Sequence, residues 1–243
     1  MDIRGRVAVV TGAGVRVGRA IALGLAEAGA DVFVHYGRSR DAAEETASAA
    51  EAMGVRTAIG SVDLSDPEIA PEVIALAESA LGPVSLLVNS ASGFPVDTIE
   101  DVERDAWQRT LDLTLSSPVF VTKAFAERLP EDLDGAVVNV TDAKTTAPYR
   151  KHFSYIVARG GIDTFTAAAA VFLAPQIRVN AVALGLILPR ATQDRVFEER
   201  LAARLPLARV GGTQPVVDTV LFLMRNDFIT GEIVRVDGGG HLK

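Results

Sequence analysis

Residues 7–20 read VAVVTGAGVRVGRA, and this stretch decides the fold of the chain. It joins a short apolar run to a glycine-rich turn, and the turn leads directly into an amphipathic segment. Glycines let the backbone turn tightly and approach a pyrophosphate, which the unpaired N–H groups at the start of the following helix then bind. A glycine-rich turn alone is a weak signal, but its place between a first strand and a first helix predicts a nucleotide site.

Outward from this stretch, short apolar runs alternate with longer amphipathic segments as far as the end of the chain. Runs of Val, Ile and Leu with little polar alternation are typical of parallel strands that are covered on both faces by helices. Alternating strands and helices form βαβ units, which build a doubly wound α/β sheet. We therefore predict one domain over residues 1–243. The predicted strands are 7–11, 31–35, 57–62, 84–89, 136–140, 178–183 and 232–236, and the predicted helices are 17–29, 40–53, 67–80, 104–129, 154–174 and 214–226.

The stretch 185–206 interrupts this alternation after the sixth predicted strand, and it has a helical pattern near 193–204. In an open α/β sheet, ligands bind outside the carboxyl ends of the strands, where this stretch begins. We expect it to form a lid over a substrate. The alternative is a plain surface excursion.

Composition narrows the class of protein. Nearly half of the residues are hydrophobic (49%), the net charge is −7, and there is no cysteine. An acidic chain is a poor partner for nucleic acid, and the lack of cysteine excludes disulfides and thiolate chemistry. The sequence has no apolar run of membrane-spanning length and no room for a signal peptide, so we expect a soluble cytoplasmic protein. His35, His152 and His241 are too scattered to suggest a metal site.

The end of the second predicted strand indicates which nucleotide is bound. A site for NAD usually has a carboxylate here for the ribose hydroxyls, but residues 34–40 contain no acid. Arg38 and Ser39 instead provide a guanidinium and a hydroxyl for a 2′-phosphate, which favours NADP(H). The alternative for Arg38 is a solvated residue at the start of a helix. Asp63, after the third strand, either accepts from the adenine amino group or caps a helix.

These motifs resemble those of the short-chain dehydrogenase/reductase family along essentially the whole chain. The similarity rests on the glycine turn, Asp63, residues 89–92 (Asn-Ser-Ala-Ser), Tyr155 at thirteen residues after Asp142, and residues 229–239. The resemblance implies a single-domain, Rossmann-type fold, an oxidoreductase with Tyr155 as its catalytic acid, and a homotetramer. Nucleotide contacts, carried over to this sequence, are Thr11, Gly12, Gly14, Arg16, Val17, Gly18, His35, Arg38, Ser39, Asp63, Leu64, Asn89, Ala91, Tyr155, Arg159 and Gly185.

Some departures from the common family pattern are similar to those of pteridine reductases. Arg16 stands where the family usually has Gly, and Asp142 where it has Ser. Residues 35–39 (His-Tyr-Gly-Arg-Ser) and 92–94 (Ser-Gly-Phe) also resemble elements of that subgroup. In that subgroup the Phe covers one face of the pterin while the nicotinamide covers the other. The resemblance implies a substrate pocket formed by Arg16, Ser92, Phe94, Asp142, Tyr155 and Leu188.

The chemistry of these side chains suits a pterin, which is a flat, polar bicycle. Phe94 offers a stacking face, while Arg16 and Asp142 would bracket the donors and acceptors of the ring. Taken alone, Phe94 is equally well an ordinary core aromatic. A carboxylate at the end of a central strand is costly to bury without a partner, which favours a functional role for Asp142.

Other departures concern catalysis. The family's Tyr-x-x-x-Lys is Tyr155…Arg159 here, its helix Asn falls at Thr114, and its Pro-Gly is Leu184-Gly185. Arg159 shares a helix face with Tyr155, so we expect it to lower the pKa of the phenol and to bond the nicotinamide ribose. Arginine does not pass protons, however, and Asp142 would then provide another proton path.

Three functions follow from these residues. The first is an NADPH-dependent reductase that transfers hydride to a C=N bond of a dihydropterin, or of a related heterocycle such as dihydrofolate, with Tyr155 and Asp142 supplying the proton. The second keeps the fold but reduces a carbonyl or oxidises an alcohol. The third, motivated by Arg159 and Thr114, is an NADP-binding protein that has lost catalysis.

Overall fold

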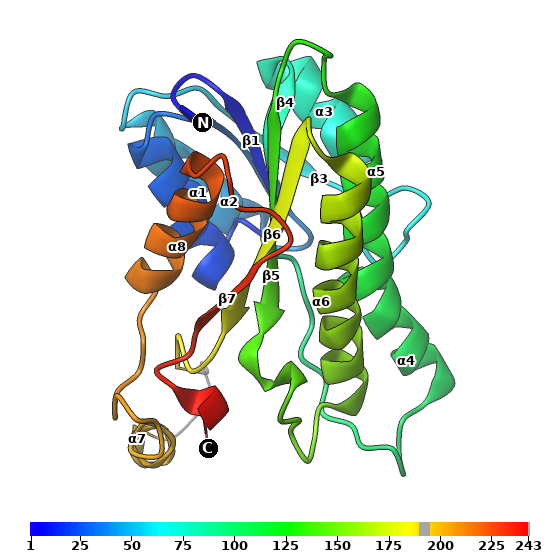
Figure 1. Cartoon of the computed structure of the whole chain (residues 1–243), viewed down its shortest axis with the longest axis vertical. Coiled ribbons are helices and arrows are strands. Elements are labelled where there is room, and N and C mark those ends of the chain that lie inside the picture. The colour runs from blue at the N-terminus through cyan, green and yellow to red at the C-terminus, as the bar shows by residue number, and fades with distance from the viewer. Residues whose placement is uncertain (190–194, 243) are drawn as a thin grey trace.

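The chain forms one seven-stranded parallel sheet between two layers of helices (Figure 1). The computed structural model describes residues 1–189 and 195–242. The order of the strands in the sheet is β3-β2-β1-β4-β5-β6-β7, so the order reverses between β1 and β4. The strands are β1 (Val7–Val10), β2 (Asp31–Tyr36), β3 (Thr57–Ser61), β4 (Val84–Asn89), β5 (Gly135–Asp142), β6 (Ile177–Leu184) and β7 (Ile233–Val236).

Two hydrophobic clusters, one on each face of the sheet, form the core. Side chains of a strand alternate between the faces, so Ala8 and Val10 pack into one cluster while Val7 and Val9 pack into the other. Figure 1 shows α1 and α8 on one face and α5 and α6 on the other. The helices are α1 (Arg16–Glu27), α2 (Arg40–Glu51), α3 (Glu72–Leu81), α4 (Arg104–Leu111), α5 (Ser117–Arg128), α6 (Phe153–Leu173), α7 (Arg195–Ala202) and α8 (Gln214–Arg225).

The predicted α/β fold and all seven strands are confirmed, but two helices differ from their predicted bounds. The third begins at Glu72 rather than near residue 67, directly after Pro71, because a residue that precedes proline avoids the helical conformation. The predicted helix 104–129 is divided by a π-helical turn, η1 (Asp112–Ser116). Pro118 has no N–H for the carbonyl of Thr114, four residues earlier, which explains why the regular pattern fails there.

The stretch 185–206 contains α7, which lies inside the predicted helical segment 193–204. Residues 190–194, within the predicted lid, lie outside the described residues. Figure 1 shows α7 beyond the carboxyl ends of the central strands, on the side where β5 and β7 end.

Helix α6 positions the chemistry of the site. By length and composition alone it could cross a membrane, with a mean hydropathy of 1.4. The side chains of Arg159 and Ile162, however, are buried, and the helix packs on β5 and β6 of the sheet. At its first turn, the ring of Phe153 stacks on Trp107 of α4, with ring centroids 5.5 Å apart. These contacts identify α6 as a core helix that is fixed at both the sheet and α4.

His35 fastens the glycine turn to the sheet. Its Nε2 lies 2.9 Å from the carbonyl oxygen of Val62, and its Nδ1 lies 3.1 Å from the amide nitrogen of Gly12. A carbonyl only accepts, so Nε2 carries the hydrogen and Nδ1 accepts from Gly12. The family resemblance implies that His35 contacts the nucleotide. Its side chain is 2% exposed and supports the glycine turn, so any contact of His35 with the nucleotide would be made by its backbone.

A neutral His35 should make the stability of the protein depend on pH. Burial lowers the pKa of His35 below its ordinary value of 6.5. The unfolded chain therefore takes up a proton in a range of pH where the folded chain does not. We expect the contribution of His35 to be complete above pH 6.5. Between pH 6.5 and the lower pKa of the folded protein, the contribution of His35 to the free energy of unfolding should decrease as the pH falls. The decrease should be at most about 1.4 kcal/mol per pH unit.

Denaturant unfolding of the wild type and of His35→Gln between pH 7.5 and 5 measures this effect. A glutamine amide accepts with one atom and donates with the other but does not titrate, so the variant should lose less stability on acidification. If the free energy of unfolding changed equally with pH in both proteins, His35 would not be the buried, neutral group that causes the loss of stability.

Candidate active site

The glycine turn lies where the strand order reverses, between β1 and β4. Thr11 joins the two strand ends, because its hydroxyl oxygen accepts from the backbone N–H groups of Ser90 and Ala91 at 2.9 and 3.0 Å. Gly12 has a φ of +66°, and a Cβ at this position would lie only 3.0 Å from the Cα of Ala91. A side chain at Gly18 would come within 2.2 Å of the carbonyl oxygen of Gly12. Both glycines are therefore required by the close approach of backbone.

The ends of β2 and β3 carry the side chains predicted to select the nucleotide. Arg38 and Ser39 are exposed, and Ser39 precedes α2. Asp63 is also exposed, and one of its oxygens accepts from the backbone N–H and the hydroxyl of Ser65 at 2.9 and 2.7 Å. These bonds hold the pKa of Asp63 below its usual range, and the charge of Arg38 adds to the effect. Asp63 thus stabilises the turn after β3 and does not cap a helix, since α3 begins only at Glu72.

Other predicted nucleotide contacts turn their side chains into the core. Asn89 is 4% exposed and donates to the side-chain oxygens of Asn139 and Thr122 at 2.8 and 3.1 Å. Leu64 is buried, and its carbonyl accepts from the hydroxyl of Ser117. Through these bonds both residues fix the loops that follow β4 and β3, so any contact of theirs with a ligand would be made by backbone.

Tyr155 and Asp142 form the centre of the candidate site. Asp142 ends β5 and Tyr155 lies in the first turn of α6, and the phenolic oxygen lies 3.0 Å from a carboxylate oxygen. Asp142 also accepts from the backbone N–H of Lys144 at 2.7 Å. A second phenol, that of Tyr149, lies 3.2 Å from each carboxylate oxygen. One buried carboxyl group therefore faces three donors.

The surroundings shift both central groups toward their protonated forms. Burial raises the pKa of Asp142, although the hydrogen bond from Lys144 and that from Tyr155 oppose the shift. Burial also raises the pKa of Tyr155 to about 12, and the negative charge of Asp142 adds to the increase. Arg159 lowers the pKa of this phenol, as we expected, but burial outweighs it. Tyr155 consequently keeps its proton at neutral pH.

Arg159 lies 4% exposed beneath Tyr155, with its guanidinium carbon 5.3 Å from the centre of the Tyr155 ring. One terminal nitrogen donates to the carbonyl oxygen of Val140 in β5. Its Nε and the hydroxyl of Thr114 in η1 are buried and have no hydrogen-bond partner within the described part of the chain. Buried donors without a partner are rare in proteins, so these two atoms mark a place for a polar group.

Phe94 reaches the site from the loop after β4 and is 40% exposed. One ring face stacks on His152, with centroids 3.7 Å apart, and the ring meets Tyr155 edge-on at 4.7 Å. The core-aromatic alternative does not hold, because a core ring would be enclosed. Ser92, two residues earlier, is exposed and its hydroxyl donates to the carbonyl of Gly93.

The remaining predicted residues lie around the same edge of the sheet. Arg16 has a φ of +54° and donates to the carbonyl oxygen of Pro189 at 3.1 Å, so it already spans from α1 to the segment after β6. Leu188, which precedes Pro189, is half-buried. Gly185 lies so close to β7 that a Cβ would approach the Cα of Asp237 to 2.5 Å. Gly14 is buried, and Val17 is half-buried on the first turn of α1.

Sequence reasoning missed Tyr149 and His152. Neither belongs to a periodic segment or to a motif, and only the fold of the loop between β5 and α6 brings them to Asp142 and Phe94. A weak signal was present, because the chain has only three tyrosines and two of them lie within thirteen residues of Asp142. In the described residues, no group of acidic or histidine side chains has the arrangement of a metal site.

Comparison with known proteins shows the family of the chain. Residues 12–241 match a family model described as enoyl-(acyl carrier protein) reductase. L-xylulose reductase of Bos taurus is 34% identical, over 98% of both chains, and L-rhamnose 1-dehydrogenase (NAD(P)(+)) of Sphingomonas sp. (strain SKA58) is 30% identical, over 98% of this chain and 96% of the other.

Among solved structures, FolM alternative dihydrofolate reductase 1 of Brucella canis, complexed with NADP, superposes with a TM-score of 0.94 at 33% identity. The match covers 100% of this chain and 97% of that one. With its glycine turn, its Tyr155 on α6 and these relatives, the chain belongs to the short-chain dehydrogenase/reductase family.

Proposed function

We propose that the protein is an NADPH-dependent reductase of a pterin, dihydropterin or dihydrofolate-like heterocycle. The observation that carries this proposal is the buried pair of Tyr155 and Asp142, 3.0 Å apart and next to the half-exposed ring of Phe94. An acid that keeps its proton, placed beside an aromatic face, suits the reduction of a flat, polar ring. The similarity to the Brucella dihydrofolate reductase supports this substrate class.

The residues present fit NADP(H). Gly12, Gly14 and Gly18 leave a bare backbone at the start of α1, where a pyrophosphate would be bound. Arg38 and Ser39 are exposed at the end of β2 for the 2′-phosphate. The guanidinium of Arg159 lies next to Tyr155 and is the donor that we propose for a ribose hydroxyl. The bound cofactor would supply the hydride, and the protein the proton.

The side chains of this protein then divide the work of proton delivery. Tyr155 gives its proton to the substrate atom next to the carbon that is reduced. Asp142 is within hydrogen-bond distance of the phenol and returns a proton to it. Arg159 stabilises negative charge on the phenol oxygen at that moment without itself transferring a proton. Phe94 and Arg16 orient the ring and the substrate edge.

The sugar-acting relatives favour a second candidate function. L-xylulose reductase and L-rhamnose 1-dehydrogenase cover this chain almost completely, and Tyr155 would equally protonate a carbonyl oxygen. In that case the aromatic ring of Phe94 would shape the pocket without stacking on a heterocycle. The third candidate, an NADP-binding protein without catalysis, rests on Arg159 and on the high pKa of Tyr155.

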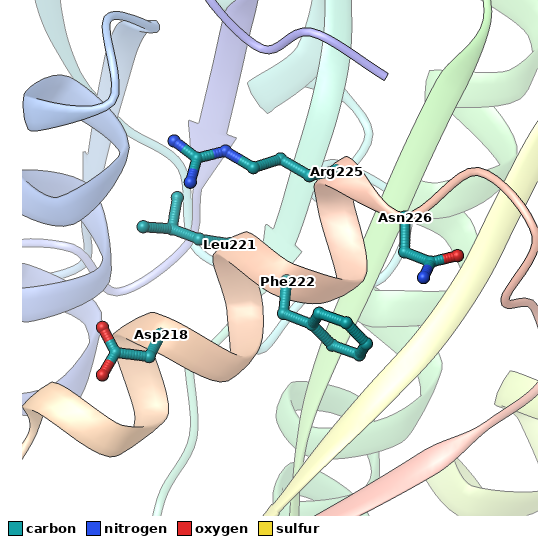
Figure 2. A pocket seen from close by; sticks show the side chains of 5 residues that line it. All are labelled: Asp218, Leu221, Phe222, Arg225 and Asn226. Carbon is teal, nitrogen blue, oxygen red and sulfur yellow. The ribbon is translucent and has the colours of Figure 1, made fainter.

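We further propose a homotetramer in the cytoplasm. Near the ends of α6 and α8, Val171, Phe172 and Phe228 are 75%, 85% and 97% exposed, which is unusual for large apolar side chains. A hollow along α8 is lined by Asp218, Leu221, Phe222, Arg225 and Asn226 (Figure 2). The N-terminal amine of Met1 donates to the carbonyl of Arg225, so this surface lies at the amino ends of the strands, opposite the active site. A second copy of the chain would cover it without blocking catalysis.

Replacement of Arg38 should change nucleotide preference. In Arg38→Ala we expect NADPH to bind about 10- to 100-fold more weakly while NADH binding changes little, because a charge-assisted pair with the 2′-phosphate is lost. Fluorescence titration of both nucleotides measures this. Arg40→Ala is the matched control, since the guanidinium of Arg40 is engaged with Glu44 at 2.8 Å. Equal losses for both variants, or equal losses for both nucleotides, would exclude recognition of the phosphate by Arg38.

Replacement of Tyr155 should abolish reduction without abolishing cofactor binding. With dihydrobiopterin or dihydrofolate as substrate, Tyr155→Phe should lower kcat about 10²- to 10⁴-fold while the Kd for NADPH stays within about twofold. NADPH oxidation is followed by its absorbance. Turnover of L-xylulose or other ketones with no pterin activity would favour the second candidate, and no wild-type turnover above that of Tyr155→Phe would reject the proposal.

Arg159→Lys separates a working enzyme from an inactive nucleotide carrier. The shorter ammonium does not reproduce the bond to the carbonyl of Val140, so we expect a loss of about 1–3 kcal/mol in unfolding free energy and no gain in turnover. Chemical denaturation and NADPH oxidation measure the two effects. Turnover that appears only in the lysine variant would show that the natural protein is not a working reductase.

A further inference from the structure

We propose that Tyr149 is a positioning residue that connects the buried carboxyl group of Asp142 to solvent, so that protons reach Tyr155 through the pair Tyr149–Asp142. This inference rests on the proposed reductase function and deepens it. It assigns a proton route to a residue that lies outside every motif of the sequence.

The geometry places Asp142 between an inner and an outer phenol. Asp142 is 6% exposed, and the inner phenol, Tyr155, is 7% exposed. Tyr149 is 37% exposed, and its hydroxyl lies 3.2 Å from both carboxylate oxygens. Tyr149 also lines a surface hollow of about 530 Å³. The other residues that line this hollow are Thr98, Ile99, Glu100, Arg150 and Phe153.

A separate route is needed because the helix face below Tyr155 does not deliver protons. Arg159 occupies the position next to the phenol, and arginine stays protonated in proteins. Within the described residues, the hydroxyl of Thr114 makes no direct hydrogen bond to Tyr155. The Tyr155 hydroxyl is hydrogen-bonded to Asp142, a group that can both take up and release a proton, unlike Arg159.

The proton balance follows from the direction of the hydrogen bonds. While Asp142 is ionised, it accepts from both phenols, and the hydrogen of Tyr155 points at Asp142 rather than at a substrate. When the Tyr149 hydroxyl passes its proton to Asp142 and takes another from water, the carboxylic acid becomes a donor to the oxygen of Tyr155. Tyr155 then releases its own proton to the substrate and receives that of Asp142. One proton from water is consumed, and every side chain returns to its starting form.

The groups around Asp142 oppose its uptake of a proton, whereas its burial favours it. Tyr155 and Arg159 of α6 face Asp142, and the backbone N–H of Lys144 faces it from the turn after β5. The Lys144 ammonium is directed away, toward the carbonyl of Gly240 at 3.4 Å. Near Gly240, His241 is paired with Asp237 at 2.8 Å. Because burial is the largest influence and raises the pKa of Asp142, the carboxyl group takes up a proton more readily than an exposed one.

The first arm of the test measures Asp142 directly and needs no substrate. The protein with NADPH bound is labelled with ¹³C at aspartate carboxyl carbons, and the Asp142 resonance is assigned by its loss in Asp142→Asn. Tyr149→Phe removes a donor that favours the ionised carboxylate, so the midpoint of the Asp142 titration should rise by about one pH unit, a tenfold change in proton affinity. Ile99→Ala changes another residue that lines the same hollow but removes no hydrogen-bond donor, so it should leave the midpoint unchanged.

The second arm measures turnover with whichever substrate the wild type reduces. Activity should fall as pH rises through the pKa of Asp142, since the ionised carboxylate holds the proton of Tyr155. In Tyr149→Phe this fall should move to higher pH, and kcat at the optimum should drop about tenfold, less than for loss of a direct acid. KM should change less than about twofold, and the solvent deuterium isotope effect on kcat should increase.

Two results would overturn the inference: an unchanged Asp142 titration in Tyr149→Phe, or equal changes in Ile99→Ala. Tyr149→Phe keeps the ring that meets Phe94 edge-on at 6.1 Å, and its thermal unfolding checks that the loop is intact. A wild type without pterin turnover would contradict the proposed substrate, while the titration would still decide whether Tyr149 controls Asp142.

Discussion

The active site depends on keeping one carboxyl group out of water. Asp142 has its place at the end of a central strand, where desolvation alone would make its charge expensive. The protein compensates with donors from three directions, namely the turn after β5, α6 and the loop between them. This arrangement requires α6 to begin at a fixed distance from β5, and so the packing of α6 on the sheet and on α4 is part of the chemistry.

The fold could be predicted because it follows from patterns that repeat along the chain. Continuous apolar strands, intervening helices and the glycine turn at residues 11–18 each indicate a doubly wound sheet, and the structure has all seven strands. The predicted helix boundaries were wrong at two places where a proline changes the local backbone. Pro71 delays α3, and Pro118 breaks the regular bonding of the helix at Thr114, which a periodic pattern of apolar residues does not reveal.

For the site, the sequence identified the principal side chains but not how they interact. Tyr155 and Asp142 were paired correctly, because strand ends and helix starts meet at one edge of a parallel sheet. The sequence did not allow the pKa of Tyr155 to be predicted. The cation of Arg159 favours a lower pKa, but burial has the larger effect and raises it. Desolvation depends on the complete packing around a group. The orientation of the His35 ring also depends on packing, since no local pattern shows that it turns inward to Gly12.

The π-helical turn at Asp112–Ser116 has a consequence for how this family member tolerates change in length. A π turn holds one residue more than the α-helix it interrupts, so its removal by a single-residue deletion would restore regular winding. The helix before the deletion would keep its orientation, because the π turn absorbs the extra residue within one turn and passes no rotation on to its neighbours. Trp107 would therefore stay stacked on Phe153 in the first turn of α6. The effect of a single-residue change in length would be confined to the π turn, which packs against α6 beside the buried hydroxyl of Thr114.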